Sequence, residues 1–325
     1  MFSYRLIFKK ALALSWRHKY LWIFGLFASL TVIGGSLESQ FITEGLGQST
    51  EGSFLGAGSL MMVVTFLNVF ILGIASIFQQ NILLGINALT VIILLLTFIF
   101  LLAWLAVSSQ SAIVDAVKKI TASQKKEINL NWLKGMRIGS QKFWPVLGLN
   151  VLVGILVSGV LVVASIPLLL MFLSEAYLFV IIYAIIFVLA VVATTVLLLI
   201  AKYAISINVL ENLSVEESIR KGYRMFRENW LVSLEAALGM FLINVLASFI
   251  FLVVLVILMS PIIIVSLVLT SSFLILATLI IILAILITFG ALLTTFQISS
   301  WTILYLELKE GKGKAKLERL VKKKK

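Results

Sequence analysis

Two short segments, both basic and aromatic, carry the residues best suited to bind an anion. They read NWLKGMRIGSQKFW (131–144) and SIRKGYRMFRENWL (218–231), and each runs directly into a long apolar stretch. Cations near a membrane surface attract anionic lipid headgroups with a free energy of about 1 kcal/mol each. We therefore predict headgroup contacts from the cations of these segments, which are Lys134, Arg137, Arg220, Lys221 and Arg224.

A second group of polar residues falls inside the apolar stretches. Glu235 lies just over one turn inside its stretch, and an acid within a membrane is a candidate functional residue. Its closeness to the cations at 220, 221 and 227 favours an ion pair over a proton relay. Uncharged polar residues either line a path or join helices, and joining helices is the more common role. The candidates for a polar site inside the membrane are Glu235, Asn150, Asn244 and Thr294.

Nucleophiles and metal ligands are scarce in this chain. It has no cysteine and one histidine, which excludes a thiol nucleophile, a Cys-based zinc site and a His-rich metal site. His18 has no nearby carboxylate to orient it as a general base, so we expect it at the surface near headgroups. Since no nucleophile–base pair, metal cluster or phosphate loop is recognisable, we predict a protein that is not an enzyme and has no cofactor and no metal site.

The composition is that of a membrane protein. Hydrophobic residues make up 62% of the 325 residues and charged residues only 12%, where a soluble domain has about 25% charged residues. The apolar runs exceed the ~20 residues needed to cross a bilayer, and they lack the alternation of a membrane β-barrel. The predicted fold class is all-α, a polytopic transmembrane helical bundle.

The positions of the charges predict the topology. All 26 Lys and Arg residues fall in four patches, at 5–19, 118–142, 202–227 and 309–325. Cations are retained on the cytoplasmic side, so each intervening stretch must leave the cytoplasm and return. This predicts N- and C-termini on the cytoplasmic side of the cell inner (plasma) membrane. A net charge of +12 would suit nucleic acid, but this clustering argues against that partner.

Three excursions require six spans. We expect them over 22–35, from 82 to about 120, over 146–173, 177–201, 231–259 and 273–305. The apolar stretch at 54–78 would make the count odd, so we expect it to be re-entrant or to lie at the outer interface. The less favoured alternative is that the stretch at 22–35 does not span the membrane. Ser260 and Pro261 predict a helix break, and Lys202 is expected to snorkel towards a helix end.

The chain predicts three parallel repeats within a single integral membrane domain, residues 1–325. Each repeat has a surface helix followed by a hairpin, and the units cover 1–120, 127–212 and 214–308, with a basic tail at 309–325. Units two and three align without gaps, Lys134 with Lys221 and Arg137 with Arg224. On each surface helix an apolar side faces a basic side, as in interfacial amphipathic helices. The apolar sides are Trp132, Met136, Gly139 and Phe143, and Ile219, Tyr223, Phe226 and Trp230. Ser214 and Glu217 form a capping-box pattern that opens the later helix.

Laid out in this way, most of the chain resembles the membrane domain of the glycerophosphoryl diester phosphodiesterases. The residues that carry the resemblance are SWRHKYLWIFGLFASL (15–30), SQSAIVDAVKKI (109–120), GMRIGSQKFWPVLGLNVL (135–152) and ENLSVEESIRKGYRMFRENW (211–230). The resemblance implies a multi-pass membrane fold and transfers no catalytic residue. The phosphodiesterase barrel itself would need about 250 further residues, for which this chain has no room.

Two functions follow as hypotheses. The first is a non-enzymatic integral membrane protein that organises or binds anionic lipids at the cytoplasmic face. The alternative is a transporter or flippase for a small or lipidic molecule. The first predicts a dry bundle with basic grooves beneath the surface helices, and the second predicts a polar cavity lined by residues such as Asn150, Asn244 and Thr294. The expected partners are membrane lipids with anionic headgroups, and the sequence leaves a homo-oligomer open.

Overall fold

A computed structural model describes residues 4–31, 82–122, 132–174, 178–269 and 271–311, and the regular structure in them is α-helical. This confirms the all-α fold class. The helices are α1 (Tyr4–Arg17), α2 (Tyr20–Ala28), α5 (Ile82–Ala122), α6 (Trp132–Gln141), α7 (Phe143–Ser174), α8 (Leu178–Glu211), α9 (Val215–Glu228), α10 (Trp230–Val268) and α11 (Ser272–Lys309).

Five of the described helices are long and apolar enough to cross a membrane, namely α5, α7, α8, α10 and α11. The protein is therefore a multi-pass membrane protein. The helix expected over 22–35 begins at Tyr20 and ends at Ala28, and its 9 residues cover only about 14 Å of the ~30 Å apolar core of a bilayer. The stretch at 54–78 lies outside the described residues. The count of six spans therefore stays a prediction.

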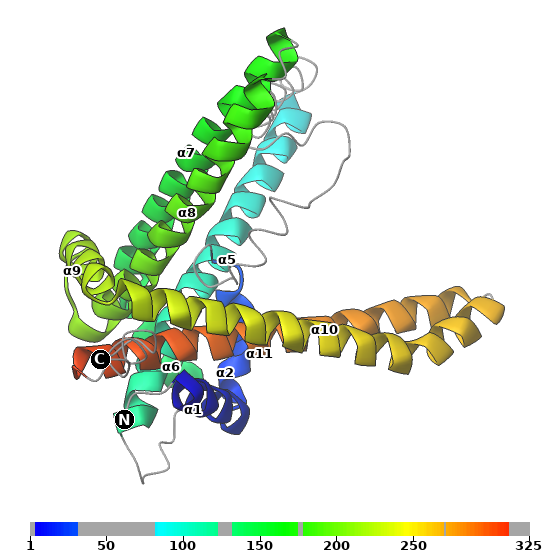
Figure 1. The fold of residues 1–325 in the computed structure, drawn as a ribbon. Helices are drawn as coiled ribbons and strands as arrows, with labels where there is room; N and C mark the ends of the chain where they lie inside the picture. The colour runs from blue at the N-terminus through cyan, green and yellow to red at the C-terminus, as the bar shows by residue number, and fades with distance from the viewer. Residues whose placement is uncertain (1–3, 32–81, 123–131, 175–177, 270, 312–325) are drawn as a thin grey trace.

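Each of the short helices α1, α6 and α9 packs mainly against one long helix. Helix α6 packs mainly against α5, the long helix that precedes it, and α9 packs mainly against α8 in the same way. Helix α1 packs against α11, the last of the described helices, so the two ends of the described chain lie together. Figure 1 shows the start of α1 and the end of α11 at one end of the molecule, from which the α7–α8 and α10–α11 hairpins diverge. The ion pair between Lys10 and Glu307, 3.1 Å long, joins these two helices.

Each of α5, α8 and α11 is divided into an exposed half and a buried half. Their N-terminal halves expose large apolar side chains, from Ile86 to Leu101 in α5, for example. Their C-terminal halves form the core, which includes Ile113, Leu199 and Leu304. The exposed apolar N-terminal halves of these helices suit contact with lipid. The Lys and Arg residues lie near the C-terminal ends of the same helices, so the packed core is at the basic end of the bundle.

Glycines and other small residues let the short helices approach their neighbours closely. A Cβ on Gly222 of α9 would lie 3.0 Å from the amide nitrogen of Ala204 and 3.1 Å from the carbonyl oxygen of Ile200, both in α8. On Gly139 of α6 it would overlap the carbonyl oxygen of Ser108 in α5. These contacts require residues without a side chain, and they fix the register of both short helices.

The proline at 261 does not end its helix, so the predicted break is wrong. Helix α10 continues through Pro261 to Val268. A proline leaves the carbonyl four residues earlier without its backbone donor, which here is that of Ile257. The hydroxyl of Ser260 donates a hydrogen bond of 3.2 Å to that same carbonyl. Neighbouring Ser side chains compensate intramembrane prolines in this way, so the Ser-Pro pair continues a helix.

Candidate functional site

The short helices α6 and α9 turn their small residues, not their large aromatic ones, towards the bundle. Gly139 is the buried residue of α6, and Ser218 and Gly222 are those of α9. Trp132 and Tyr223, predicted for the apolar side of an interfacial helix, are about half exposed. The physical reason is that these helices pack against protein helices at close range, which only small residues permit.

Three of the five predicted headgroup cations are available for a ligand. Lys134, Arg137 and Arg224 are exposed, and none makes an ion pair with another described residue. The other two are engaged within the protein. Arg220 pairs with Glu216 at 2.8 Å, and Lys221 pairs with Glu211 at 3.1 Å.

Glu211 holds three helices together at the basic end. It is the last residue of α8, and its carboxylate accepts from Lys221 of α9 at 3.1 Å and from Lys309 of α11 at 2.6 Å. The hydroxyl of Tyr305 in α11 donates to it as well, at 2.8 Å. Lys221 therefore has a structural partner, which leaves its aligned counterpart Lys134 as the freer cation.

Exposed tryptophans surround the same end of the molecule. Trp16, Trp132, Trp144 and Trp230 each expose about half of their surface or more. Trp side chains belong at membrane–water interfaces, so they place the interface near the starts of α6, α7 and α10.

His18, half-buried between α1 and α2, makes an edge-to-face contact with Tyr20 at 5.9 Å. Burial, and then the charge of Arg17, lower the pKa of His18 below its ordinary 6.5.

A cluster of buried polar residues lies where α5, α8 and α11 meet. We call it the polar core, and it consists of Gln110, Lys202, Gln297 and Trp301. The ammonium of Lys202 lies 5.4 Å from the centre of the Trp301 ring. Only 9% of Lys202 is exposed, so its side chain stays inside the bundle and the prediction of snorkelling is wrong. Lys202 lies about two and a half turns before the end of α8.

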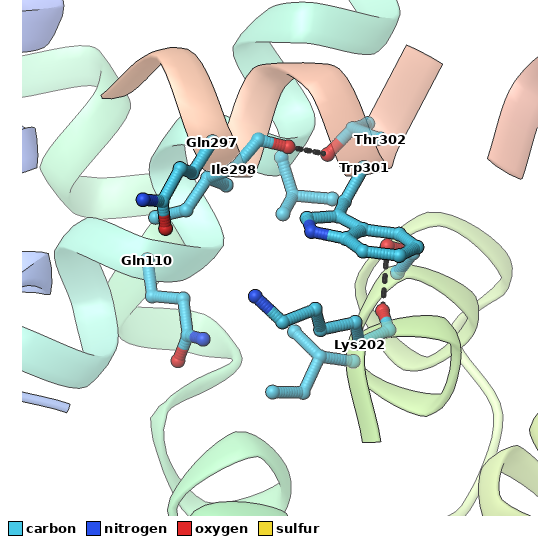
Figure 2. Close-up of a pocket in the computed structure, with 9 residues that line it drawn as sticks. Gln110, Lys202, Gln297, Ile298, Trp301 and Thr302 are labelled. Atoms are coloured by element: carbon cyan, nitrogen blue, oxygen red, sulfur yellow. Dashed lines mark hydrogen bonds between the residues drawn. The ribbon is translucent and has the colours of Figure 1, made fainter. Parts of the chain in front are cut away.

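Two small cavities border the polar core, each with a volume of about 20 Å³. Lys202, Gln297 and Trp301 line both of them. Gln110 lines the first and Asn244 the second. In Figure 2 the Lys202 ammonium points into the first cavity, with Gln110 and Gln297 on its far side and the Trp301 indole nitrogen facing the same space.

The structure brings some of the predicted intramembrane polar residues together and separates others. The side-chain amide of Asn150 donates a hydrogen bond of 3.0 Å to the side-chain oxygen of Gln110, so Asn150 contacts the polar core. Asn244 lines a cavity, and its side-chain oxygen has no hydrogen-bond partner among the described residues. Thr294 is buried in α11 and lines neither cavity. Glu235 lies elsewhere, where it accepts a hydrogen bond of 2.5 Å from the hydroxyl of Tyr4 in α1.

The sequence-based prediction missed the centre of this cluster. Gln110 and Trp301 were not predicted as site residues, and Lys202 was assigned to a helix end. A signal was present, because α5, α8 and α11 each carry one long polar side chain roughly three turns before their C-terminal end. That shared position becomes meaningful only once the three helix ends are known to meet.

Comparison with protein-family models, with curated proteins and with solved structures finds no match for this chain. The resemblance to the phosphodiesterase membrane domain therefore stays a prediction. The described residues offer two candidate sites, the exposed cations of α6 and α9 and the polar core.

Proposed function

We propose that this protein binds anionic membrane lipids through exposed cations at the basic end of its bundle, and that it does so without catalysing a reaction. The proposal includes the orientation, with this basic end on the cytoplasmic side of the plasma membrane. The observation that carries it is that Lys134, Arg137 and Arg224 are exposed and make no ion pair with another described residue.

A cation that makes no ion pair within the protein can bind the phosphate of a lipid headgroup. Arginine offers a planar fork of donors that matches two phosphate oxygens, which makes Arg137 and Arg224 the preferred contacts. Exposed Trp132 and Trp230 begin α6 and α10, where an interfacial ring would hold these cations at headgroup depth. The close packing through Gly135 and Gly222 holds each arginine on a rigid helix.

The test is the amount of anionic lipid that stays bound to the purified protein, counted by native mass spectrometry. The double variant Arg137→Ala with Arg224→Ala is expected to retain less phosphatidylglycerol than the unchanged protein. At about 1 kcal/mol per cation, each site should lose roughly fivefold in affinity.

The matched control removes two cations that already have partners, with Lys119→Ala and Arg220→Ala. Lys119 pairs with Asp115 at 2.6 Å and Arg220 with Glu216 at 2.8 Å, so we expect lipid retention to stay unchanged. If both double variants lose lipid equally, net charge alone explains retention. If neither loses lipid, the two arginines bind no headgroup. Either outcome contradicts the proposal.

Transport of a small polar solute is a second candidate, and the cavity lined by Asn244 and Lys202 favours it. Each cavity has a volume of only about 20 Å³, which is near the space needed by one water molecule. A transport path would therefore require the helices to move apart. Release of a trapped solute from reconstituted vesicles would favour this function over lipid binding.

A further inference from the structure

Helix α1 carries two neighbouring cations on its outer side. Arg5 and Lys9 are exposed and make no ion pair with another described residue, whereas Lys10 pairs with Glu307 of α11 at 3.1 Å. Residues four positions apart are neighbours on a helix surface, and like charges at that spacing destabilise the helix. The pair is therefore better suited to binding an external anion than to stabilising α1.

Exposed apolar side chains continue the same stripe of the helix. Leu12 and Trp16 follow Arg5 and Lys9 at helical spacing, and they are 52% and 60% exposed. The buried side of α1 is a different one, formed by Ile7, Ala11, Leu14 and Ser15. Cations beside exposed apolar residues on one helix are typical of helices that lie in a membrane interface. A free phosphate ion would have no use for Leu12 and Trp16, so the stripe favours an amphiphilic anion.

The aromatic end of the stripe is held in place by the start of α2. The Trp16 ring contacts the ring of Trp22, with their centres 5.8 Å apart. The indole N–H of Trp22 donates a hydrogen bond of 2.8 Å to the carbonyl oxygen of Ser15. Because Trp rings prefer the membrane–water interface, this aromatic pair favours placing the stripe at the depth of the headgroups.

The position of α1 in the bundle supports that depth. The hydroxyl of Tyr4 donates to Glu235 near the start of α10, and Lys10 pairs with Glu307 near the end of α11. Six residues of helix rise about 9 Å, which is close to the usual distance between two packed helices. Helix α1 therefore bridges the base of the α10–α11 hairpin, at the end of the molecule where the described chain starts and ends (Figure 1).

We propose that α1 forms a further binding site for an anionic phospholipid. Arg5 and Lys9 hold the phosphate of the headgroup, while Leu12 and Trp16 contact the first part of its acyl chains. The inference shares with the proposed function the placement of the basic end at the membrane surface. It depends on none of the cations of α6 and α9, so the two can fail separately.

The test is native mass spectrometry of the full-length protein in detergent, titrated with phosphatidylglycerol. At about fivefold in affinity for each cation, the double variant Arg5→Ala with Lys9→Ala should bind one of its lipids about twenty-fivefold more weakly. Both side chains are exposed and make no ion pair with a described residue, so the unfolding temperature should stay unchanged. The control Lys119→Ala with Arg220→Ala removes the same charge from paired cations and should keep that lipid.

Comparison with the double variant of Arg137 and Arg224 separates the two sites. If that variant loses lipid and the variant of Arg5 and Lys9 loses none, the α1 site is wrong and the proposed function stands. If the variant of Arg5 and Lys9 loses lipid and that of Arg137 and Arg224 does not, the α1 site stands alone. Equal loss in the paired-cation control would mean that net charge explains binding, which overturns the α1 site.

A label on the stripe distinguishes lipid from free phosphate. The chain has no cysteine, so Leu12→Cys can carry a single fluorescent dye in nanodiscs of phosphatidylcholine and phosphatidylglycerol. We expect lipids with brominated acyl chains to quench the dye, and inorganic phosphate in the buffer to leave this quenching unchanged. Quenching by aqueous iodide alone would show that the stripe faces water, and quenching by neither would show that another part of the protein covers it. Both results overturn the proposal.

Discussion

At the scale of single residues, small side chains decide how the bundle is assembled at its basic end. Gly222 and Gly139 lie where two helix backbones nearly touch, and the cations beside them in sequence consequently project outward. In α9 the Lys-Gly-x-Arg pattern therefore has a packing role at Gly222 and an exposed surface at Arg224. The two roles are separable, because they involve opposite sides of one helix.

Replacing Gly139 by alanine tests the packing role. The new Cβ would overlap the Ser108 carbonyl oxygen, which belongs to a backbone and cannot move aside. Overpacking of this kind typically destabilises by about 1–3 kcal/mol, so we expect Gly139→Ala to lower the thermal unfolding temperature.

The control is Gly159→Ala, in the long helix α7, where a Cβ meets nothing within 4 Å. There alanine should be neutral or slightly stabilising, since glycine inside a helix costs up to about 1 kcal/mol. Equal unfolding temperatures for the two variants would argue against close α6–α5 packing.

At the scale of elements, helix α9 is held at its start by a capping box and in its middle by an ion pair. The hydroxyl of its cap Ser214 accepts from the Glu217 amide at 3.3 Å, and the Glu217 carboxylate accepts from the Ser214 amide at 3.4 Å. This confirms the predicted capping box. Lys221 then ties the helix to Glu211 at the end of α8. The arginine proposed to contact lipid is thus carried by an element fixed at two points.

Removing the cap should destabilise the protein measurably. For Ser214→Ala we expect a loss of about 1 kcal/mol, the usual value for a serine cap with a side-chain bond, measured by denaturant or thermal unfolding in detergent. Ser271 caps α11 without such a bond, so Ser271→Ala should cost only a few tenths of a kcal/mol. Equal losses in the two variants would show that the Ser214 hydrogen bonds contribute nothing.

At the scale of the whole molecule, the short helices and the ends of α5, α8 and α11 gather at one end (Figure 1). The hairpins α7–α8 and α10–α11 extend from it with apolar side chains exposed along their length. Since lipid covers such surfaces, the two ends of the α10–α11 hairpin must face different sides of the membrane if it spans.

The native chain has no cysteine, so single introduced cysteines report orientation without background. We expect Gln141→Cys and Glu228→Cys, both exposed at the basic end, to react with an impermeant thiol reagent only after the cells are opened. Ser272→Cys, at the far end of the α10–α11 hairpin, should react in intact cells. Labelling of all three from the same side would contradict the predicted topology.

The sequence by itself determined the fold class and the long helices. Uninterrupted apolar runs have few conformations open to them in lipid, because every backbone polar group must be satisfied internally. The extent of α5, from Ile82 to Ala122, matched the prediction of a helix from 82 to about 120. Local chemistry also sufficed for the capping box at Ser214, since both partners lie within one turn.

Only the tertiary structure decided which side of each short helix faces inward and where Lys202 lies. Both outcomes depend on neighbours distant in sequence: the α8 backbone admits Gly222 in place of Tyr223, and Trp301 of α11 receives the Lys202 ammonium. Hydrophobicity ranks residues by their preference for lipid or water, and it does not say which helix will provide the partner. A buried cation therefore looks like a snorkelling one until the helix that packs over it is known.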